Sequence, residues 1–255
     1  MSLHIWTPGE LSSELRRYQR RCWRLVEAQH RVSTLKLVDT MDEQTTLEDL
    51  IEGTKPAIPI ECRHLDYLLS TPFRYSAEYP KGSRFRRAGR TLGVYYSAER
   101  ADTAVAEMAF YRLLFFAESP QTPWPNDAAE YTAFAVAVST LRCLDLTEPP
   151  LVSERAVWID PVNYEPCQSL ADTARAVEAE VIRYESVRDP QSGENAAILK
   201  CSAFAEPQPL ERQTWRMRLS ATGVQAICEF PPARLEFGQS AFATDPRIVA
   251  ISWKR

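Results

Sequence analysis

The sequence predicts an α+β fold, and three observations lead to that prediction. The chain has 255 residues, of which 45% are hydrophobic and 25% charged, proportions typical of a globular protein with enough apolar residues to form a core. Runs of β-favouring residues gather in its second half, whereas helical spacings dominate the first. Helices and strands do not alternate regularly, so a twisted or split sheet is favoured over a doubly wound parallel one.

The N-terminal part is expected to be mainly helical. A first helix is predicted over residues 10–22, because apolar residues recur every three or four positions. Arginines crowd its other faces, which suits either a solvated helix or one that docks on an acidic partner. Residues 23–28 look extended. A second helix is predicted over 42–52, ended by Gly53, and a short third one over 61–69.

The rest of the chain is expected to be rich in strands. A strand over 93–97 leads into a helix that Asp102 or Thr103 caps and that runs to about residue 116. A further helix is predicted over 170–182, where apolar residues fall at i, i+4, i+7 and i+11. Other strands are expected over 131–139, 141–146, 196–204, 213–219, 224–230 and 248–253.

Charge and motifs exclude several classes of protein. The net charge of −4 argues against a dedicated nucleic-acid binder, which needs a basic surface. No glycine-rich nucleotide-binding loop, GxSxG element or HExxH helix is present. No secretory signal or membrane span is recognisable. The six cysteines form no CxxC pair and the three histidines lie far apart, so we expect no metal site, reduced thiols and a cytoplasmic location.

Three segments carry the candidate functional residues, and the first is the basic stretch 80–90. Four arginines lie within seven of its residues, bracketed by glycines. Guanidinium groups bind phosphate oxygens through paired hydrogen bonds, and glycine permits close backbone approach, so this stretch suits a diphosphate. A solvated basic loop explains the same pattern, and spacing alone favours that explanation.

The other two segments place polar residues beside apolar ones. Tyr96 ends the strand over 93–97, and Glu107 follows eleven residues later in an apolar helical stretch. A carboxylate there is costly to bury without a partner, so Glu107 either belongs to a functional site or faces water. The third segment, 184–190, is followed by Asn195 and is either a functional loop or a connecting turn.

Together with Trp-Arg-Leu-Val-Glu-Ala at 23–28, these segments resemble the RES-domain family, which is named after characteristic Arg, Glu and Ser residues. The resemblance extends over residues 20–205, and the eleven-residue step from tyrosine to glutamate is part of it. Phe85 replaces the usual Trp and Arg86 stands where Asn is common, so the grip on substrate is expected to differ in detail. The matching positions are Arg24, Arg84, Tyr96, Glu107 and Ser186.

The resemblance implies a fold like that of ADP-ribosyltransferase toxins, with a twisted or split β-sheet core. We expect a single domain over 1–255, with a helical N-terminal elaboration over 1–70. The strand-rich core would cover 71–255, and the strand that carries Arg24 would contribute to it. The strands after Glu206 have no counterpart that we can assign to the family core.

The resemblance also implies an activity, that of a toxin-like enzyme that degrades NAD. NAD⁺ would be a substrate, cleaved to nicotinamide and ADP-ribose, with no cofactor and no metal. Transfer of ADP-ribose to a protein or other acceptor is the main alternative, and a catalytically silent binding protein is the second. The residues expected to be catalytic are Glu107, Arg84 and Ser186, and those expected to bind NAD are Arg24, Tyr96 and Asn195.

The implied roles follow the chemistry of NAD. Glu107 would stabilise the positive charge that develops on the ribose. Arg24 and Arg84 would hold the diphosphate, and Tyr96 would pack against the nicotinamide or its ribose. Ser186, and less strongly Asn195, would contact the nicotinamide side. The expected partners are NAD⁺ and an Xre-type antitoxin, with homo-oligomers possible and neither membrane nor nucleic acid bound directly. RNA binding through the basic stretch is the least favoured alternative.

Overall fold

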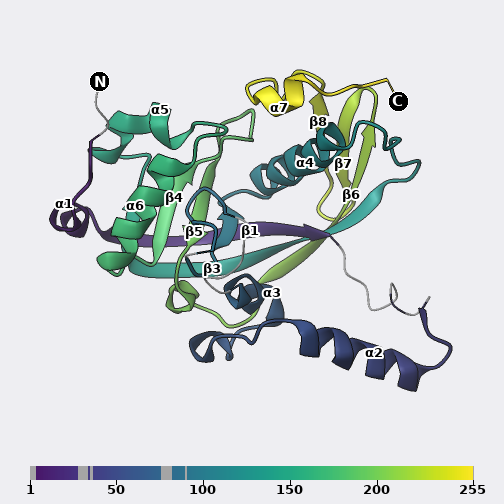
Figure 1. Cartoon of the computed structure of the whole chain (residues 1–255), viewed down its shortest axis with the longest axis horizontal. Helices are drawn as coiled ribbons and strands as arrows, with labels where there is room; N and C mark the ends of the chain where they lie inside the picture. The colour runs from purple at the N-terminus through teal and green to yellow at the C-terminus, as the bar shows by residue number, and fades with distance from the viewer. Residues whose placement is uncertain (1–3, 28–33, 35–36, 76–81, 90, 255) are drawn as a thin grey trace.

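Eight strands form one mixed sheet in the described part of the chain, residues 4–27, 34, 37–75, 82–89 and 91–254 of the computed structural model (Figure 1). The strands are β1 Arg16–Glu27, β2 Tyr95–Ala98, β3 Ala129–Asp145, β4 Val181–Glu185, β5 Glu194–Ile198, β6 Glu211–Ser220, β7 Gly223–Cys228 and β8 Ala233–Gly238. The α-helices are α1 Pro8–Ser13, α2 Met41–Thr54, α3 Tyr67–Ser70, α4 Ala101–Glu118, α5 Arg155–Trp158, α6 Glu165–Ala176 and α7 Pro246–Val249. Short 3₁₀ turns lie at Ile60–Cys62, Thr71–Arg74, Leu151–Glu154 and Cys201–Ala203.

The sheet divides along β3, the longest strand. One edge of β3 pairs with β1. On the other edge, its first half pairs with β6 and its last three residues run parallel to β4. Because β1 also pairs with β2 at Trp23 and Ala98, the strands β1, β2, β5, β4 and β3 close into a ring, from which β6, β7 and β8 extend. The predicted α+β fold with a split sheet is confirmed.

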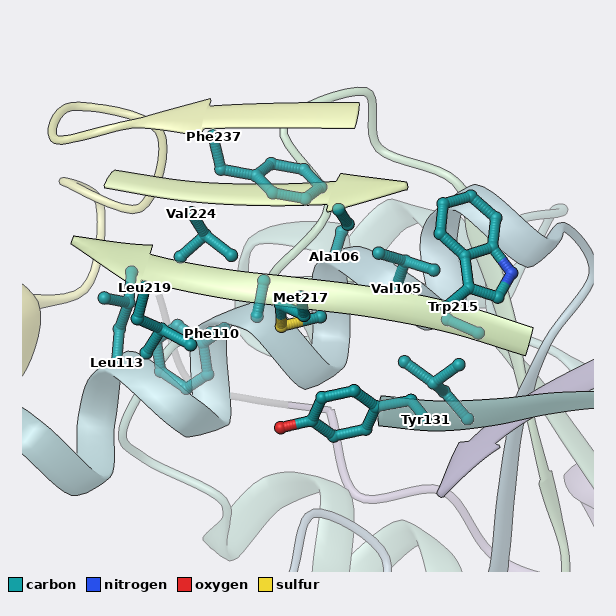
Figure 2. Close-up of a cluster of buried hydrophobic side chains, with 14 of the residues drawn as sticks. Val105, Ala106, Phe110, Leu113, Tyr131, Trp215, Met217, Leu219, Val224 and Phe237 are labelled. Carbon is teal, nitrogen blue, oxygen red and sulfur yellow. The ribbon is translucent and has the colours of Figure 1, made fainter. Parts of the chain in front are cut away.

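Helix α4 covers the part of the sheet formed by β6, β7 and β8 (Figures 1 and 2). Its residues are apolar on almost every face, as expected of a helix buried between elements. Phe110 and Leu113 are fully buried in a cluster with Trp215 and Met217. The helix begins after Arg100, so the predicted caps Asp102 and Thr103 lie inside its first turn. Helices α5 and α6 pack over β4 and β5 in a second cluster.

The N-terminal segment differs from its prediction. Helix α1 is short and has a capping box between Thr7 and Glu10. The prediction of a helix over 10–22 is wrong beyond Ser13, because residues 16–22 pair with β3 as part of β1. The extended stretch is confirmed over 23–27 as the end of β1, and residue 28 lies outside the described residues. The second helix is confirmed as α2, but Gly53 does not end it, because the helix continues to Thr54. In place of the third helix predicted over 61–69 there is the 3₁₀ turn Ile60–Cys62, followed by the four-residue helix α3. Helix α2 projects away from the sheet (Figure 1).

Three later predictions are also wrong, at least in part. The strand predicted over 196–204 ends at Ile198 in β5, and the 3₁₀ turn Cys201–Ala203 follows it. The helix predicted over 170–182 is α6, which begins at Glu165 and ends at Ala176. Glu178 then has a left-handed backbone conformation, with φ of 59°, and Val181 already belongs to β4. The strand predicted over 248–253 is absent, since Ile248 lies in the short helix α7. The strands predicted over 131–139 and 141–146 are one strand, β3, and β8 was not predicted.

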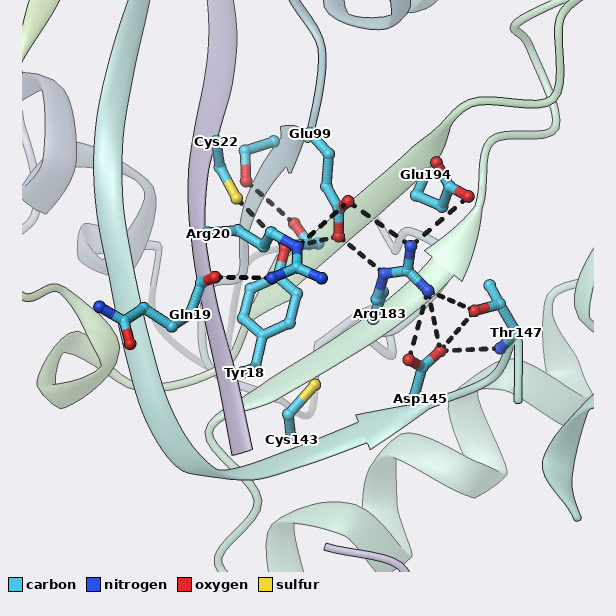
Figure 3. Close-up of polar contacts among 12 residues, drawn as sticks. Tyr18, Gln19, Arg20, Cys22, Glu99, Cys143, Asp145, Thr147, Arg183 and Glu194 are labelled. Atoms are coloured by element: carbon cyan, nitrogen blue, oxygen red, sulfur yellow. Dashed lines mark hydrogen bonds and ion pairs between the residues drawn. The ribbon is translucent and has the colours of Figure 1, made fainter. Parts of the chain in front are cut away.

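A buried ionic network joins the strands of the ring (Figure 3). Arg183 on β4 donates to Glu99, which follows β2, and forms an ion pair with Asp145 at the end of β3. Tyr18 on β1 donates to the same Glu99 at 3.0 Å. These charges are at least four-fifths buried and each has a partner, so the network links β1, β3 and β4 without leaving a buried charge alone.

The cysteines follow the prediction at four positions and depart from it at two. Cys22, Cys143, Cys167 and Cys228 are buried free thiols. Cys62 and Cys201, by contrast, form a disulfide with their Cα atoms 5.6 Å apart, a separation ordinary for such a bond. Spacing along the chain gave no sign of this pair, which is separated by 139 residues. No helix in the described ranges has the length and apolar character needed to span a membrane.

Candidate active site

A cavity of about 300 Å³ opens where β1, β2, α4 and β5 meet. Five of the six predicted site residues line it, namely Arg24, Arg84, Tyr96, Glu107 and Asn195. They come from β1, β2, α4, β5 and the stretch 82–89, which are far apart in the sequence and meet at this cavity. The volume lies at the lower end of the range for small-molecule sites, so the cavity fits part of a dinucleotide.

Glu107 projects from α4 into this cavity and is held by two donors. The Ser186 hydroxyl and the Asn195 amide Nδ2 each lie 2.7 Å from the same carboxylate oxygen, Oε1. Within the described residues no donor reaches the second oxygen, Oε2, which therefore stays available to a ligand. The sequence left open whether Glu107 belongs to a functional site or faces bulk water. In the structure its side chain lines the cavity.

Ser186 lies behind Glu107 and does not itself line the cavity. Its oxygen accepts hydrogen bonds from the backbone N–H groups of Arg188 and Asp189, at 3.2 and 3.0 Å. With these acceptor positions used, the hydroxyl proton is directed at Glu107. Ser186 is thus buried and fully bonded, and its contacts orient the carboxylate.

The loop that carries Ser186 is attached to the same helix as Glu107. Thr103, one turn before Glu107 on α4, donates to Asp189 Oδ2 at 2.7 Å. Gly193 is the last residue of this loop before β5, and a Cβ at this position would lie 2.2 Å from Thr103 Oγ1. A residue with a side chain therefore cannot occupy position 193 unless the loop moves away from α4.

The two predicted arginines are held differently. Arg84 is 7% exposed, and its Nη1 and Nη2 donate to the carbonyls of Trp158 and Asp160 at 2.7 and 2.8 Å. Its guanidinium also lies 4.6 Å from the ring centre of Tyr164, another cavity residue. Arg24 donates one bond, from Nη1 to the Tyr96 carbonyl at 2.7 Å. No described residue accepts from its other two nitrogens, and burial lowers the pKa of this guanidinium.

The rest of the basic stretch 80–90 is not a solvated loop where it is described, over 82–89. Arg86 is 5% exposed, and Phe85 is fully buried beside Tyr184. Arg87 donates to Asp172 at 2.6 Å and to Glu165 at 2.7 Å. Positions 80, 81 and 90 lie outside the described residues. The stretch therefore contributes Arg84 to the cavity. Arg86 is buried inside the protein, and Arg87 bonds to acidic residues of the protein itself.

Aromatic rings form much of the remaining wall. The Tyr96 hydroxyl is bonded to Ser83 and to the Phe85 N–H, so the ring is fixed at the cavity edge. Burial, followed by the nearby Glu107 charge, raises the pKa of Tyr184. This phenol therefore stays protonated at neutral pH, and Glu107 is the one carboxylate among the described residues that line the cavity.

Arg188 is the charged residue of the described cavity lining that the sequence did not predict. Its side chain is 3% exposed, and its guanidinium forms an ion pair with Asp245. It also lies 3.9 Å from the ring centre of Phe110. Arg188 lies in the segment 184–190, which the sequence marks as a candidate functional loop, but nothing in the spacing distinguishes it from a solvated arginine.

A model of one protein family matches the chain over residues 58–220, and that family is the RES domain. The chain belongs to the RES domain family. Glu107, Ser186, Asn195, Arg84 and Tyr96 lie within the matched part of this RES-domain protein, as does Arg188. Arg24 precedes the matched part, although the structure brings it to the same cavity.

A comparison with solved structures gave a match of low sequence identity. A similar chain occurs in the crystal structure of the MbcT–MbcA toxin–antitoxin complex of M. tuberculosis. The identity is 13% and the TM-score 0.46, over 79% of this chain and 90% of that one. No curated protein gave a significant match to the RES-domain protein.

Proposed function

We propose that this RES-domain protein cleaves the bond between nicotinamide and ribose in NAD⁺ and releases nicotinamide and ADP-ribose. The observation that carries the proposal is the setting of Glu107. One carboxylate, oriented by two hydrogen-bond donors, faces a cavity whose other charged lining residues in the described chain are arginines. Such a site combines a stabiliser of positive charge with groups that attract a diphosphate.

The reaction suits a site with a single carboxylate. The bond from C1′ to the pyridinium nitrogen breaks with its electron pair on nitrogen, so nicotinamide leaves as a neutral molecule and needs no general acid. The ribose becomes an oxocarbenium ion, which the Glu107 carboxylate stabilises. Water then adds to C1′ and loses a proton to give ADP-ribose. The paired carboxylates of ordinary glycosidases are unnecessary for this departure.

The arginines have separate tasks in this mechanism. Arg24 has two nitrogens free of described acceptors, so it is the main contact for the diphosphate. Arg84 adds positive charge, but its Nη atoms already support the backbone at Trp158 and Asp160. Ser186 and Asn195 position Glu107, a role that their observed bonds support better than direct contact with nicotinamide.

NAD⁺ is a substrate in this proposal, and no metal takes part. We also propose that the protein acts as a toxin and that an antitoxin protein, of the Xre type that the family resemblance implies, restrains it in the cell. Expression would then damage the host unless the antitoxin gene is expressed as well. High-level expression of an active protein without growth arrest would contradict this part of the proposal.

The test is incubation of the purified protein with NAD⁺, with nicotinamide and ADP-ribose separated by chromatography. Glu107→Gln keeps the acceptor for Ser186 and Asn195 but removes the charge, and Glu118→Gln, on the exposed end of the same helix, is the matched control. A charge about 4 Å away in a medium of effective dielectric constant near 20 contributes about 4 kcal/mol, so we expect roughly a thousandfold loss for Glu107→Gln.

Each product pattern has its own meaning. Equal amounts of nicotinamide and ADP-ribose from the parent and from Glu118→Gln support hydrolysis. Nicotinamide without matching ADP-ribose identifies a transferase and directs the search to the acceptor. Absence of both products from folded protein contradicts the proposal and favours a silent binding protein on this scaffold.

A further inference from the structure

The segment after β8 contributes to the candidate site although it lies beyond the part of the chain that matches the RES domain. Within this segment Asp245, which is 1% exposed, lies next to α7. Its Oδ2 is 2.6 Å from Nη1 of Arg188, the arginine that lines the cavity. The segment is fixed on α4, because Phe242 packs against Phe110 with ring centres 5.9 Å apart.

Arg188 connects Asp245 to a second wall of the cavity. Its Nη2 donates to the Pro161 carbonyl at 2.6 Å and to the Tyr164 hydroxyl at 3.1 Å. Tyr164 lines the cavity, and its ring lies under the guanidinium of Arg84. Arg188 therefore donates a hydrogen bond to a wall residue that Arg84 also contacts.

We infer that Asp245 is a positioning residue for substrate binding, acting through Arg188. Arg188 is then the third positive charge that faces the diphosphate, beside Arg24 and Arg84. This inference rests on the proposed function, since it names a further determinant of NAD⁺ binding at the same site. It also assigns a function to the C-terminal segment, for which the sequence predicted no role.

The carboxylate at position 245 matters because Arg188 is buried. A guanidinium removed from water needs a nearby opposite charge, and removing that charge leaves the buried cation uncompensated. In Asp245→Asn the Arg188 side chain is therefore expected to turn toward water and away from the cavity, so that the diphosphate loses its contact. Burial opposes ionisation of Asp245, but bonds from Arg247 and the charge of Arg188 hold its pKa below the usual value. The acid is therefore ionised at neutral pH, and Arg188 keeps its partner there.

Asparagine separates this role from the structural role of Asp245. Asp245 Oδ1 accepts from the backbone N–H of Arg247 at 2.9 Å and so caps α7. Asparagine caps helices about as well as aspartate, so Asp245→Asn preserves the cap and removes the charge. The matched control is Glu236→Gln, the same type of change at an exposed position of β8.

The experiment compares NAD⁺ turnover in the parent, Asp245→Asn, Arg188→Gln, the double variant and Glu236→Gln. Because the diphosphate is held in the bound substrate as well as in the transition state, Asp245→Asn should raise KM about tenfold and change kcat less than about threefold. The double variant should have the KM of Arg188→Gln alone, since the two changes remove one interaction. Glu236→Gln should behave as the parent.

The inference is overturned if Asp245→Asn keeps the parent's KM, or if the losses from the two single changes add in the double variant. If Asp245→Asn does not fold, a parent-like KM in Arg188→Gln overturns it instead. A parent that releases no nicotinamide refutes the proposed function, and calorimetric titration with inorganic pyrophosphate then decides the inference. In that case tighter binding by the parent than by Asp245→Asn supports it, whereas equal affinities or no binding by the parent overturn it.

Discussion

Replacing Ser186 by alanine tests whether this residue serves the fold, the carboxylate of Glu107, or both. The Ser186 oxygen accepts from two backbone N–H groups, those of Arg188 and Asp189, and both residues are more than nine-tenths buried. Each N–H loses its partner in the variant, at a cost of roughly 1–3 kcal/mol. We therefore expect the free energy of unfolding to fall by about 3 kcal/mol.

This loss translates into an observable shift. For a chain of this size, 1 kcal/mol corresponds to about 2–4 °C, so the melting temperature should fall by about 6–12 °C. Thermal unfolding followed by circular dichroism measures it. Ser153→Ala is the control, because Ser153 is exposed and its hydroxyl donates to the nearby Pro150 carbonyl. That variant should melt close to the parent.

The catalytic loss from Ser186→Ala is measured separately, well below both melting temperatures. A hydrogen bond to a charged group contributes about 1.5–3 kcal/mol, so kcat for NAD⁺ should fall about 10- to 100-fold. Asn195 still holds Glu107 in this variant, which is why we expect a smaller loss than for Glu107→Gln. Parent-like kcat together with a lowered melting temperature would refute the orienting role, and an unchanged melting temperature would refute the role in the loop.

Three further predictions concern Arg24, Gly193 and the buried thiols. Arg24→Gln should raise KM for NAD⁺ about tenfold, and an unchanged KM would exclude Arg24 as the diphosphate contact. Gly193→Ala should lower the free energy of unfolding by about 2 kcal/mol or more, because its Cβ would meet Thr103, and a thermal melt equal to the parent's would contradict that clash. Burial raises the pKa of Cys22 to about 11 and that of Cys143 to about 12, so both thiols stay protonated at pH 8. Iodoacetamide should therefore label them after denaturation only, and labelling of the folded protein would show that they are exposed.

Local patterns predicted the elements that have a regular or continuous apolar pattern. Strands β6 and β7 were predicted because buried and exposed residues alternate along them, and helix α4 because its apolar stretch continues for the length of a helix. The prediction of a helix over 10–22 failed because residues 18 and 22 are four apart, as on one face of a helix, although both are buried within a strand. Pairing with β3, more than a hundred residues away, determined its structure, and no local pattern contains that information.

The helix predicted over 170–182 failed for a related reason. Its apolar positions continue at helical spacing past residue 176, but the left-handed conformation of Glu178 ends the helix and starts a new direction. Val181 and Ile182 then belong to a strand that is buried on both faces. A non-glycine residue in this conformation carries no reliable sequence signal, so the end of the helix was not predictable.

The candidate site, too, was predictable in part, and the contacts that depend on distant segments of the chain were not. Family resemblance singled out residues of which Arg24, Arg84, Tyr96 and Glu107 line one cavity, while Ser186 lies behind it and is bonded to Glu107. The contacts of Arg84 with backbone carbonyls were not predictable, because they depend on where the 158–160 loop lies. Arg188 was missed because its partner Asp245 is 57 residues away.

The ring closed by β1 sets a limit on how this protein can be shortened. The match to the family covers residues 58–220, but a fragment cut there would lack the strand that pairs with β3 along most of its length and with β2 at Trp23. It would expose a long row of unpaired backbone groups on β3, a surface prone to aggregation. It would also lack Arg24 and Asp245. The smallest fragment worth expressing therefore starts before Arg16 and continues past α7, and its boundaries follow the strand pairing and not the limits of the family match.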